Sequence, residues 1–231
     1  MRAILILIAT AAFIAAPAVT TPFMGYDPAM FPVVIARPSI QPAGYAFAIW
    51  GLIYAWLLVH AGFGVLRRSD AVWDAVRLPH LGALVLGTAW LAIASFYPLT
   101  ATAAIAVMAG FTLWSFLAAI PAHDRWLLAA PLGLFAGWLT AASMVSLGVI
   151  LAGYGWLSDT GAALAMLAVI LAVAVVVQLR QASMPSYSVS VVWAAIGVAA
   201  VNWQDNPLVA YSALIGAGIQ TGVALWAFQR R

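Results

Sequence analysis

Three histidines are the side chains of this sequence best suited to acid–base or metal chemistry, and their spacing matches no standard site. None of His60, His80 and His123 stands in a metal-binding pattern such as H-E-x-x-H. The sequence has no cysteine, which excludes a thiolate nucleophile, a thiolate metal site and a disulfide framework. It also has no phosphate-cradling glycine loop. We therefore expect no catalytic residue, no metal site of a standard type and no required cofactor.

Two interpretations of the histidines remain open. All three lie toward the same end of the apolar segments, where water and lipid headgroups can satisfy an imidazole. Alternatively, His60 and His80, at the ends of two adjacent antiparallel helices, share a polar or haem-iron site.

Tryptophan is the more informative residue type, with eleven copies in the chain. Five lie near the ends of apolar segments, as in the aromatic belts of membrane proteins: Trp73, Trp126, Trp156, Trp203 and Trp226. Five others fall deeper: Trp50, Trp90, Trp114, Trp138 and Trp193. Four of these come from four successive segments, so their flat faces can line a shared cavity for a planar hydrophobic ligand. Packing within a bundle explains them equally well.

The elements that position these residues are membrane-spanning helices. Of the 231 residues, 66% are hydrophobic and 6% are charged, whereas a soluble domain carries about 25% charged residues. The apolar runs are continuous and do not alternate with polar residues, which excludes a transmembrane β-barrel. We predict a single-domain, all-α transmembrane bundle of eight spans: Ala3–Val19, Gly44–Val65, His80–Tyr97, Thr100–Ile120, Trp126–Leu151, Thr160–Val177, Ser186–Trp203 and Pro207–Phe228.

The arginines predict how the bundle sits in the membrane. Loops on the side of the N-terminus hold all but one of them: Arg2, Arg67, Arg68, Arg77, Arg125, Arg180, Arg230 and Arg231. Only Arg37 lies on the opposite side. The positive-inside rule then places both termini in the cytoplasm. The arginines are scattered and form no patch for nucleic acid. Alternatively, Met1–Val19 is a cleaved signal peptide, which leaves seven spans.

With these boundaries no Asp or Arg lies well inside a span, which makes proton- or sodium-driven transport an unfavoured function. The longest loop on the side away from the termini, Thr20–Ala43, contains five prolines. These exclude a continuous helix and favour an extended, semi-rigid cover. Two glycine pairs, Gly133/Gly137 and Gly218/Gly222, predict close helix contacts within the bundle, with a homodimer interface as the alternative.

The segment Gln41–Tyr54 resembles the start of the second helix in the tryptophan-rich sensory protein family, also called TspO or the translocator family. The matching positions are Pro42, Tyr45, Phe47, Trp50 and Tyr54. Trp50 and Tyr54 are four residues apart and therefore share a helix face. Further along, Trp90 and Trp138 resemble the tryptophans of the third and fifth family helices. Gly87 and Ser146 stand where that family has asparagine.

The resemblance implies a five-helix core over residues 1–152, with residues 153–231 forming three additional helices. It also implies binding of a tetrapyrrole such as protoporphyrin or haem, or of a sterol-like lipid, in a sensory or transport role. Whether the protein is an enzyme stays open, because some family members promote porphyrin breakdown. We expect a pocket under Thr20–Ala43 lined by Tyr45, Phe47, Trp50, Tyr54, Trp90, Trp114 and Trp138.

Two other functions fit the same apolar sequence. One is an uncoupled transporter that moves a lipophilic solute. The other is a regulatory subunit that docks on a partner membrane protein through its last three helices.

Overall fold

The structure is a computed structural model that describes residues 1–20, 23–119 and 124–230. Within these ranges the chain is all-helical and contains no strand. The eight α-helices are α1 (Arg2–Ala15), α2 (Ile49–Leu66), α3 (Ala71–Ala94), α4 (Pro98–Ala118), α5 (Ala129–Gly153), α6 (Asp159–Arg180), α7 (Ser186–Asn202) and α8 (Pro207–Gln229). The predicted polytopic helical bundle is confirmed.

Six of these elements are long and apolar enough to cross a membrane. They are α3, α4, α5, α6, α8 and the continuous helical stretch Gly44–Leu66, in which a short 3-10 turn (Gly44–Ala48) precedes α2. α1 and α7 are equally apolar but shorter, with 14 and 17 residues. The chain is therefore a multi-pass membrane protein.

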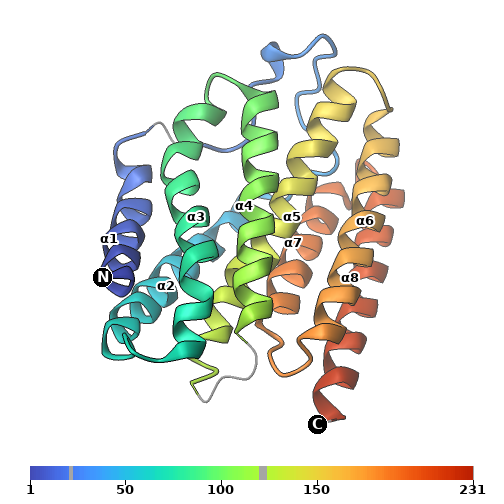
Figure 1. Cartoon of the computed structure of the whole chain (residues 1–231). Helices are drawn as coiled ribbons and strands as arrows, with labels where there is room; N and C mark the ends of the chain where they lie inside the picture. The colour runs from blue at the N-terminus through green and yellow to red at the C-terminus, as the bar shows by residue number, and fades with distance from the viewer. Residues whose placement is uncertain (21–22, 120–123, 231) are drawn as a thin grey trace.

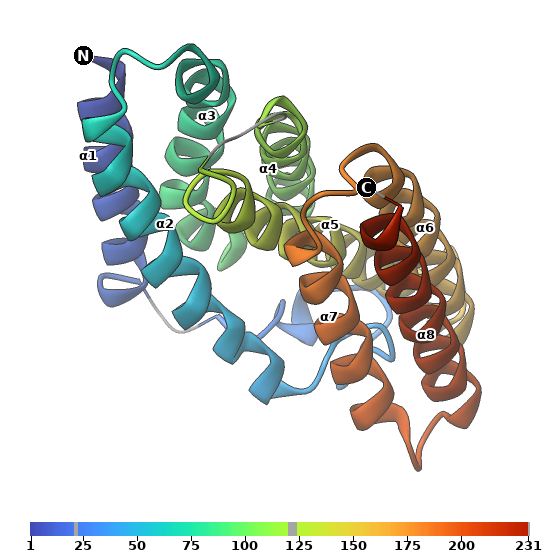
Figure 2. The same cartoon turned by 90° about the horizontal axis from the view of Figure 1, so that it is seen from below.

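Helix α5 lies in the middle of the bundle. α1 to α4 gather on one side of it and α6 to α8 on the other (Figures 1 and 2). It packs against α2, α4, α6 and α7. Segment 23–43 crosses one end of the bundle, which we call the loop end (Figure 1). The α2–α3 turn and the C-terminus lie at the opposite end.

Glycines explain how α7 approaches α5 so closely. A methyl group on Gly137 would run into the backbone oxygen of Tyr187, and one on Gly133 would run into the Ser186 hydroxyl. The first predicted glycine pair is therefore a contact within the bundle, as expected. The second pair is not. Gly218 and Gly222 lie on the exposed outer face of α8, where a methyl group added to either would meet no other atom within 4 Å.

Helix α3 begins nine residues before its predicted start at His80. Asp70 accepts hydrogen bonds from the backbone N–H groups of Val72 and Trp73, at 2.8 and 3.2 Å, and so caps the helix. Pro79 lies inside α3 without ending it. Of the charged residues that suggested a loop, Asp70 is thus the capping residue of α3, and Asp74 and Arg77 lie in its first two turns.

Arg77 corrects the expectation that no charge lies inside a span. It is 5% exposed on α3 and donates hydrogen bonds to the backbone oxygens of Gly64, Arg67 and Arg68. It also pairs with Asp74 at 3.0 Å. These carbonyls belong to the end of α2, where a cation is favourable. Arg77 therefore holds the α2–α3 turn together.

The proline-rich segment is fixed to the ends of α5, α6 and α7. The backbone N–H and the hydroxyl of Ser39 both donate to Asp159, and the Asn202 amide donates to the Ser39 oxygen at 2.7 Å. Backbone bonds join Val33 to Gly153 and Ala43 to Gly197. The segment is therefore a stiff cover over the loop end, as its prolines predict.

Candidate functional site: an aromatic cavity at the loop end

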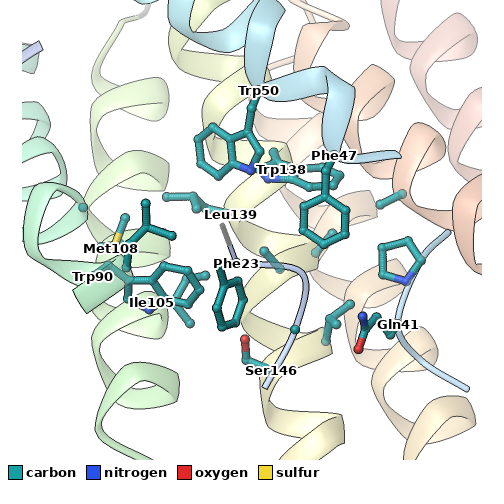
Figure 3. A pocket seen from close by; sticks show the side chains of 18 of the residues that line it. Phe23, Gln41, Phe47, Trp50, Trp90, Ile105, Met108, Trp138, Leu139 and Ser146 are labelled. Atoms are coloured by element: carbon teal, nitrogen blue, oxygen red, sulfur yellow. The ribbon is translucent and has the colours of Figure 1, made fainter. Parts of the chain in front are cut away.

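A cavity of about 260 Å³ lies beneath this cover, between α1, α2, α3, α4 and α5 (Figure 3). Its walls are largely aromatic: Phe13, Phe23, Tyr26, Phe47, Trp50, Tyr54, Trp90 and Trp138. Pockets for small molecules measure about 300–1,000 Å³. This cavity therefore accommodates a compact flat molecule or one edge of a larger ring system.

Five of the seven predicted pocket residues line the cavity. They are Phe47, Trp50, Tyr54, Trp90 and Trp138.

The other two do not. Tyr45 lies in the 3-10 turn before α2, is 51% exposed, and packs on Trp193 outside the cavity. Trp114 is 56% exposed, because the buried face of α4 runs through residues such as Met108, Thr112 and Ser115.

The aromatic rings present both faces and edges to the cavity. Trp50 stacks on Tyr54, with ring centroids 5.2 Å apart and planes 28° apart. Trp138 meets Trp50 edge-on at 6.2 Å. On the opposite wall Phe23 meets Trp90 edge-on at 5.0 Å, and the Trp90 indole N–H donates to the Ala101 oxygen. Trp90 is thereby held in place, and its face remains for apolar contact.

Two polar side chains of the lining, Gln41 and Ser146, lie on the side of the cavity away from Trp50 (Figure 3). Tyr26 shares a hydrogen bond of 3.0 Å with Thr102. Burial raises the pKa of Tyr26 above its usual value, although hydrogen bonds to Thr102 and Ser146 partly oppose this. Gln41 donates to the backbone oxygen of Met24. No Asp, Glu, Lys, Arg or His is among the described residues that line the cavity.

Sequence reasoning missed three of the aromatic wall residues: Phe13, Phe23 and Tyr26. Phe13 lies in an apolar helix where any position can face inward, and its partner Gly87 makes room for it on α3. Phe23 and Tyr26 belong to the cover, and an aromatic residue in a predicted loop was the available signal. Gly87 and Ser146, where asparagine was expected from the resemblance, both line the cavity. The pocket therefore has fewer hydrogen-bonding groups than the resemblance implies.

The chain is similar to a known protein family. The family model described as TSPO-like protein matches residues 3–226. The chain belongs to the TSPO-like protein family. The match confirms the resemblance seen in the sequence and continues through the last three helices. No curated protein and no solved structure matches the chain.

At the other end of this TSPO-like protein, Trp73 corrects the prediction of an interface anchor. It is 3% exposed and stacks on His60, with centroids 5.0 Å apart. Its indole N–H donates to Asp124, which also pairs with Arg67 at 2.8 Å. The predicted belt residues Trp126, Trp156, Trp203 and Trp226 are about half-exposed or more. Trp73 is therefore a core residue of what we call the closed end, defined by His60, Trp73, Arg77 and Asp124.

The histidines also lie elsewhere than their first interpretation predicts. His60 and His80 are 3% and 0% exposed, so headgroups do not satisfy them. Their rings lie side by side, 5.3 Å apart and nearly perpendicular. His123 lies outside the described residues. No group of three metal-ligating side chains occurs in the described part of the chain.

Proposed function

We propose that this TSPO-like protein binds a flat, apolar small molecule in the aromatic cavity, in a sensory or regulatory role. The observation that carries the proposal is the convergence of Trp50, Trp90 and Trp138 on one cavity under a fixed cover. Several aromatic faces around one space favour a planar hydrophobic ligand, because stacking and edge contacts add to apolar burial.

The lining residues further favour a ligand whose buried part is uncharged. A buried carboxylate without a partner is costly, and the described lining has no cation to pair with one. A sterol-like lipid with one hydroxyl fits, since Tyr26, Gln41 and Ser146 provide hydrogen bonds on one side. A tetrapyrrole fits if its ring enters the cavity while its carboxylates stay at the mouth, where their partial burial still costs affinity.

Binding is favoured over passage of a solute through the bundle. Between the cavity and the closed end lies Phe135, which is 0% exposed and contacts both Trp50 of the cavity wall and His80. This side chain closes the route along α5. We further propose that the protein lies in a bacterial inner membrane; the arginine distribution supports an orientation with both termini in the cytoplasm.

Titration with protoporphyrin, followed by tryptophan fluorescence, tests the proposal. We expect saturable quenching with the purified full-length protein in detergent. The double variant Trp50→Ala/Trp138→Ala should lose most of the affinity. The control Trp114→Ala/Trp203→Ala removes two exposed tryptophans and should bind as the wild type does. Unsaturable quenching, or equal affinity in the two double variants, would contradict the proposal.

A further inference from the structure

We propose that His60 and His80 form a two-coordinate site for a soft monovalent cation, copper(I). The site lies at the closed end, separate from the aromatic cavity, and does not depend on the proposed ligand. It joins α2 to α3, with the two imidazole centroids 5.3 Å apart and the planes at 87°. Imidazole is a good ligand for copper.

His80 is the buried side chain whose ring nitrogens lack a partner. Its side chain is 0% exposed, and neither ring nitrogen has a hydrogen-bond partner among the described residues. Buried polar atoms are rarely left unpaired, because the lost hydration is not replaced. A cation bound by one of the two ring nitrogens replaces the lost hydration of that nitrogen.

A third unpaired polar atom belongs to α1, which packs against α3. The Thr10 hydroxyl is also buried without a partner in the described residues. Arg2 pairs with Asp74 at 2.7 Å and Phe13 packs at Gly87, which fixes α1 and α3 as parallel neighbours. This register puts Thr10 about one turn, or about 5 Å, along α3 from His80. Two packed helices thus each bury an unsatisfied polar side chain at a similar depth of the bundle.

The surroundings orient His60 as a metal ligand. Its Nδ1 lies 2.9 Å from the Leu127 backbone oxygen, which can only accept, so Nδ1 carries the proton. Nε2 then presents its lone pair. Trp73 stacks on the ring at 5.0 Å and fixes its plane. A backbone carbonyl on the second nitrogen is the usual support of a metal-bound histidine.

Ligand number and charge select the cation. Zinc needs four ligands, three of them from protein even in catalytic sites, and the described residues offer no group of three. A monovalent d¹⁰ ion is satisfied by two nitrogens on opposite sides. Two bonds of about 2 Å each put those nitrogens about 4 Å apart and the two ring centroids about 6 Å apart. The rings, with centroids at 5.3 Å, therefore separate by somewhat less than about 1 Å when the ion binds. The buried cation Arg77, one helical turn away at Gly64, further disfavours a divalent ion.

Haem is excluded at this position by the neighbouring rings. Trp73 covers one face of His60, and Phe135 lies edge-on to His80 at 6.3 Å. A macrocycle between the imidazoles would have to displace both aromatic side chains. A bare ion displaces neither.

Copper(I) binding by the full-length protein in detergent, measured anaerobically against a chromogenic chelator, tests the site. The absence of cysteine removes the usual competing ligand. We expect one copper(I) per chain, and an X-ray absorption spectrum with two nitrogen neighbours at about 2 Å. His60→Ala/His80→Ala should weaken binding by more than the roughly 10–100-fold that loss of a supporting partner costs. His123→Ala, which removes the remaining histidine, should bind normally.

Three results would overturn the proposal. The first is that the wild type retains no more copper(I) than the double variant does. The second is a spectrum with sulfur neighbours from methionine. The third is that the wild type retains zinc(II) more tightly than copper(I). The spectrum is measured on the wild type, so it decides the question even if the double variant does not fold. Normal binding of protoporphyrin by the double variant would show that the two sites are independent.

Discussion

The two ends of this bundle use the same residue types for opposite purposes. At the loop end, Trp50, Trp90 and Trp138 surround a cavity that no charged residue lines among those described. At the closed end, Trp73 is packed between His60 and Phe63, and its indole N–H is bound to Asp124. At one end the aromatic rings thus line a cavity, and at the other end they cover charged and polar groups.

The comparison shows that the distance of a tryptophan from the end of its predicted span does not reveal the role of that tryptophan. Trp73 was expected at the membrane surface and lies in the core, whereas Trp114 was expected in the pocket and lies outside. What decides the role is the face of the helix and whether a neighbour fills the space beside the ring. Substitutions matched between the two ends can test this difference.

The largest effect is expected for Trp73→Ala. It removes a fully packed side chain, leaves His60 without its stacking partner and takes away one of the donors to Asp124, which keeps its pair with Arg67. Such truncations cost about 3–5 kcal/mol. We expect a pronounced fall in thermal stability in detergent. Trp138→Ala should cost less stability, because one face of Trp138 already borders the cavity. Equal losses would contradict the contrast between the two ends.

Trp138→Ala should instead weaken ligand binding. Loss of a central aromatic contact costs about 2 kcal/mol, or roughly 30-fold in Kd. The control is Trp114→Ala, which removes an exposed tryptophan of the neighbouring helix. Quenching titrations of the two variants with protoporphyrin measure the difference. An equal change in both would mean that the ligand does not occupy the cavity.

A smaller effect is expected where the cover is attached. Asp159→Ala removes the acceptor of the Ser39 N–H and hydroxyl and loosens the cover at α6. With about 1 kcal/mol per lost hydrogen bond, we expect dissociation of the ligand to become several-fold faster in stopped-flow experiments. Asp205→Ala is the control, because its pair with Arg37 is long and exposed. A dissociation rate unchanged by Asp159→Ala would show that the cover does not retain the ligand.

The smallest effect is expected from pH. The described lining contains no group that titrates near neutrality, so affinity for an uncharged ligand should be constant from about pH 6 to 9. Burial raises the pKa of Tyr26 above 10.0, so its neutral form stabilises the closed cover below that pH. This stabilisation is lost as the pH rises further. Tyr26→Phe should remove the alkaline loss, and a change in affinity near pH 7 would contradict the account.

Much of the fold could be predicted from the sequence, because continuous apolar runs leave a helical bundle as the solution in a membrane. The spacing of Trp50 and Tyr54 by four residues correctly predicted a shared face. Tyr45 was misplaced because the chain enters α2 through a 3-10 turn, which rotates that side chain outward.

Other features of the two sites depend on tertiary contacts. The start of α3 was missed because Asp70, Asp74 and Arg77 look like loop residues until the α2 carbonyls that Arg77 binds are known. The contact between His60 and His80 required the pairing of α2 with α3. Helical periodicity could not identify Phe13 either, because α1 is apolar on every face.

We propose that the cavity binds a flat ring system and excludes charged groups of the ligand. The most direct test compares two ligands that share one ring: protoporphyrin and its uncharged dimethyl ester, each titrated against the wild type and Trp50→Ala/Trp138→Ala. We expect the ester to bind about tenfold tighter or more, a difference of about 1.4 kcal/mol, and the double variant to bind both weakly. Tighter binding of the diacid, or ester binding unaffected by the double variant, would contradict it.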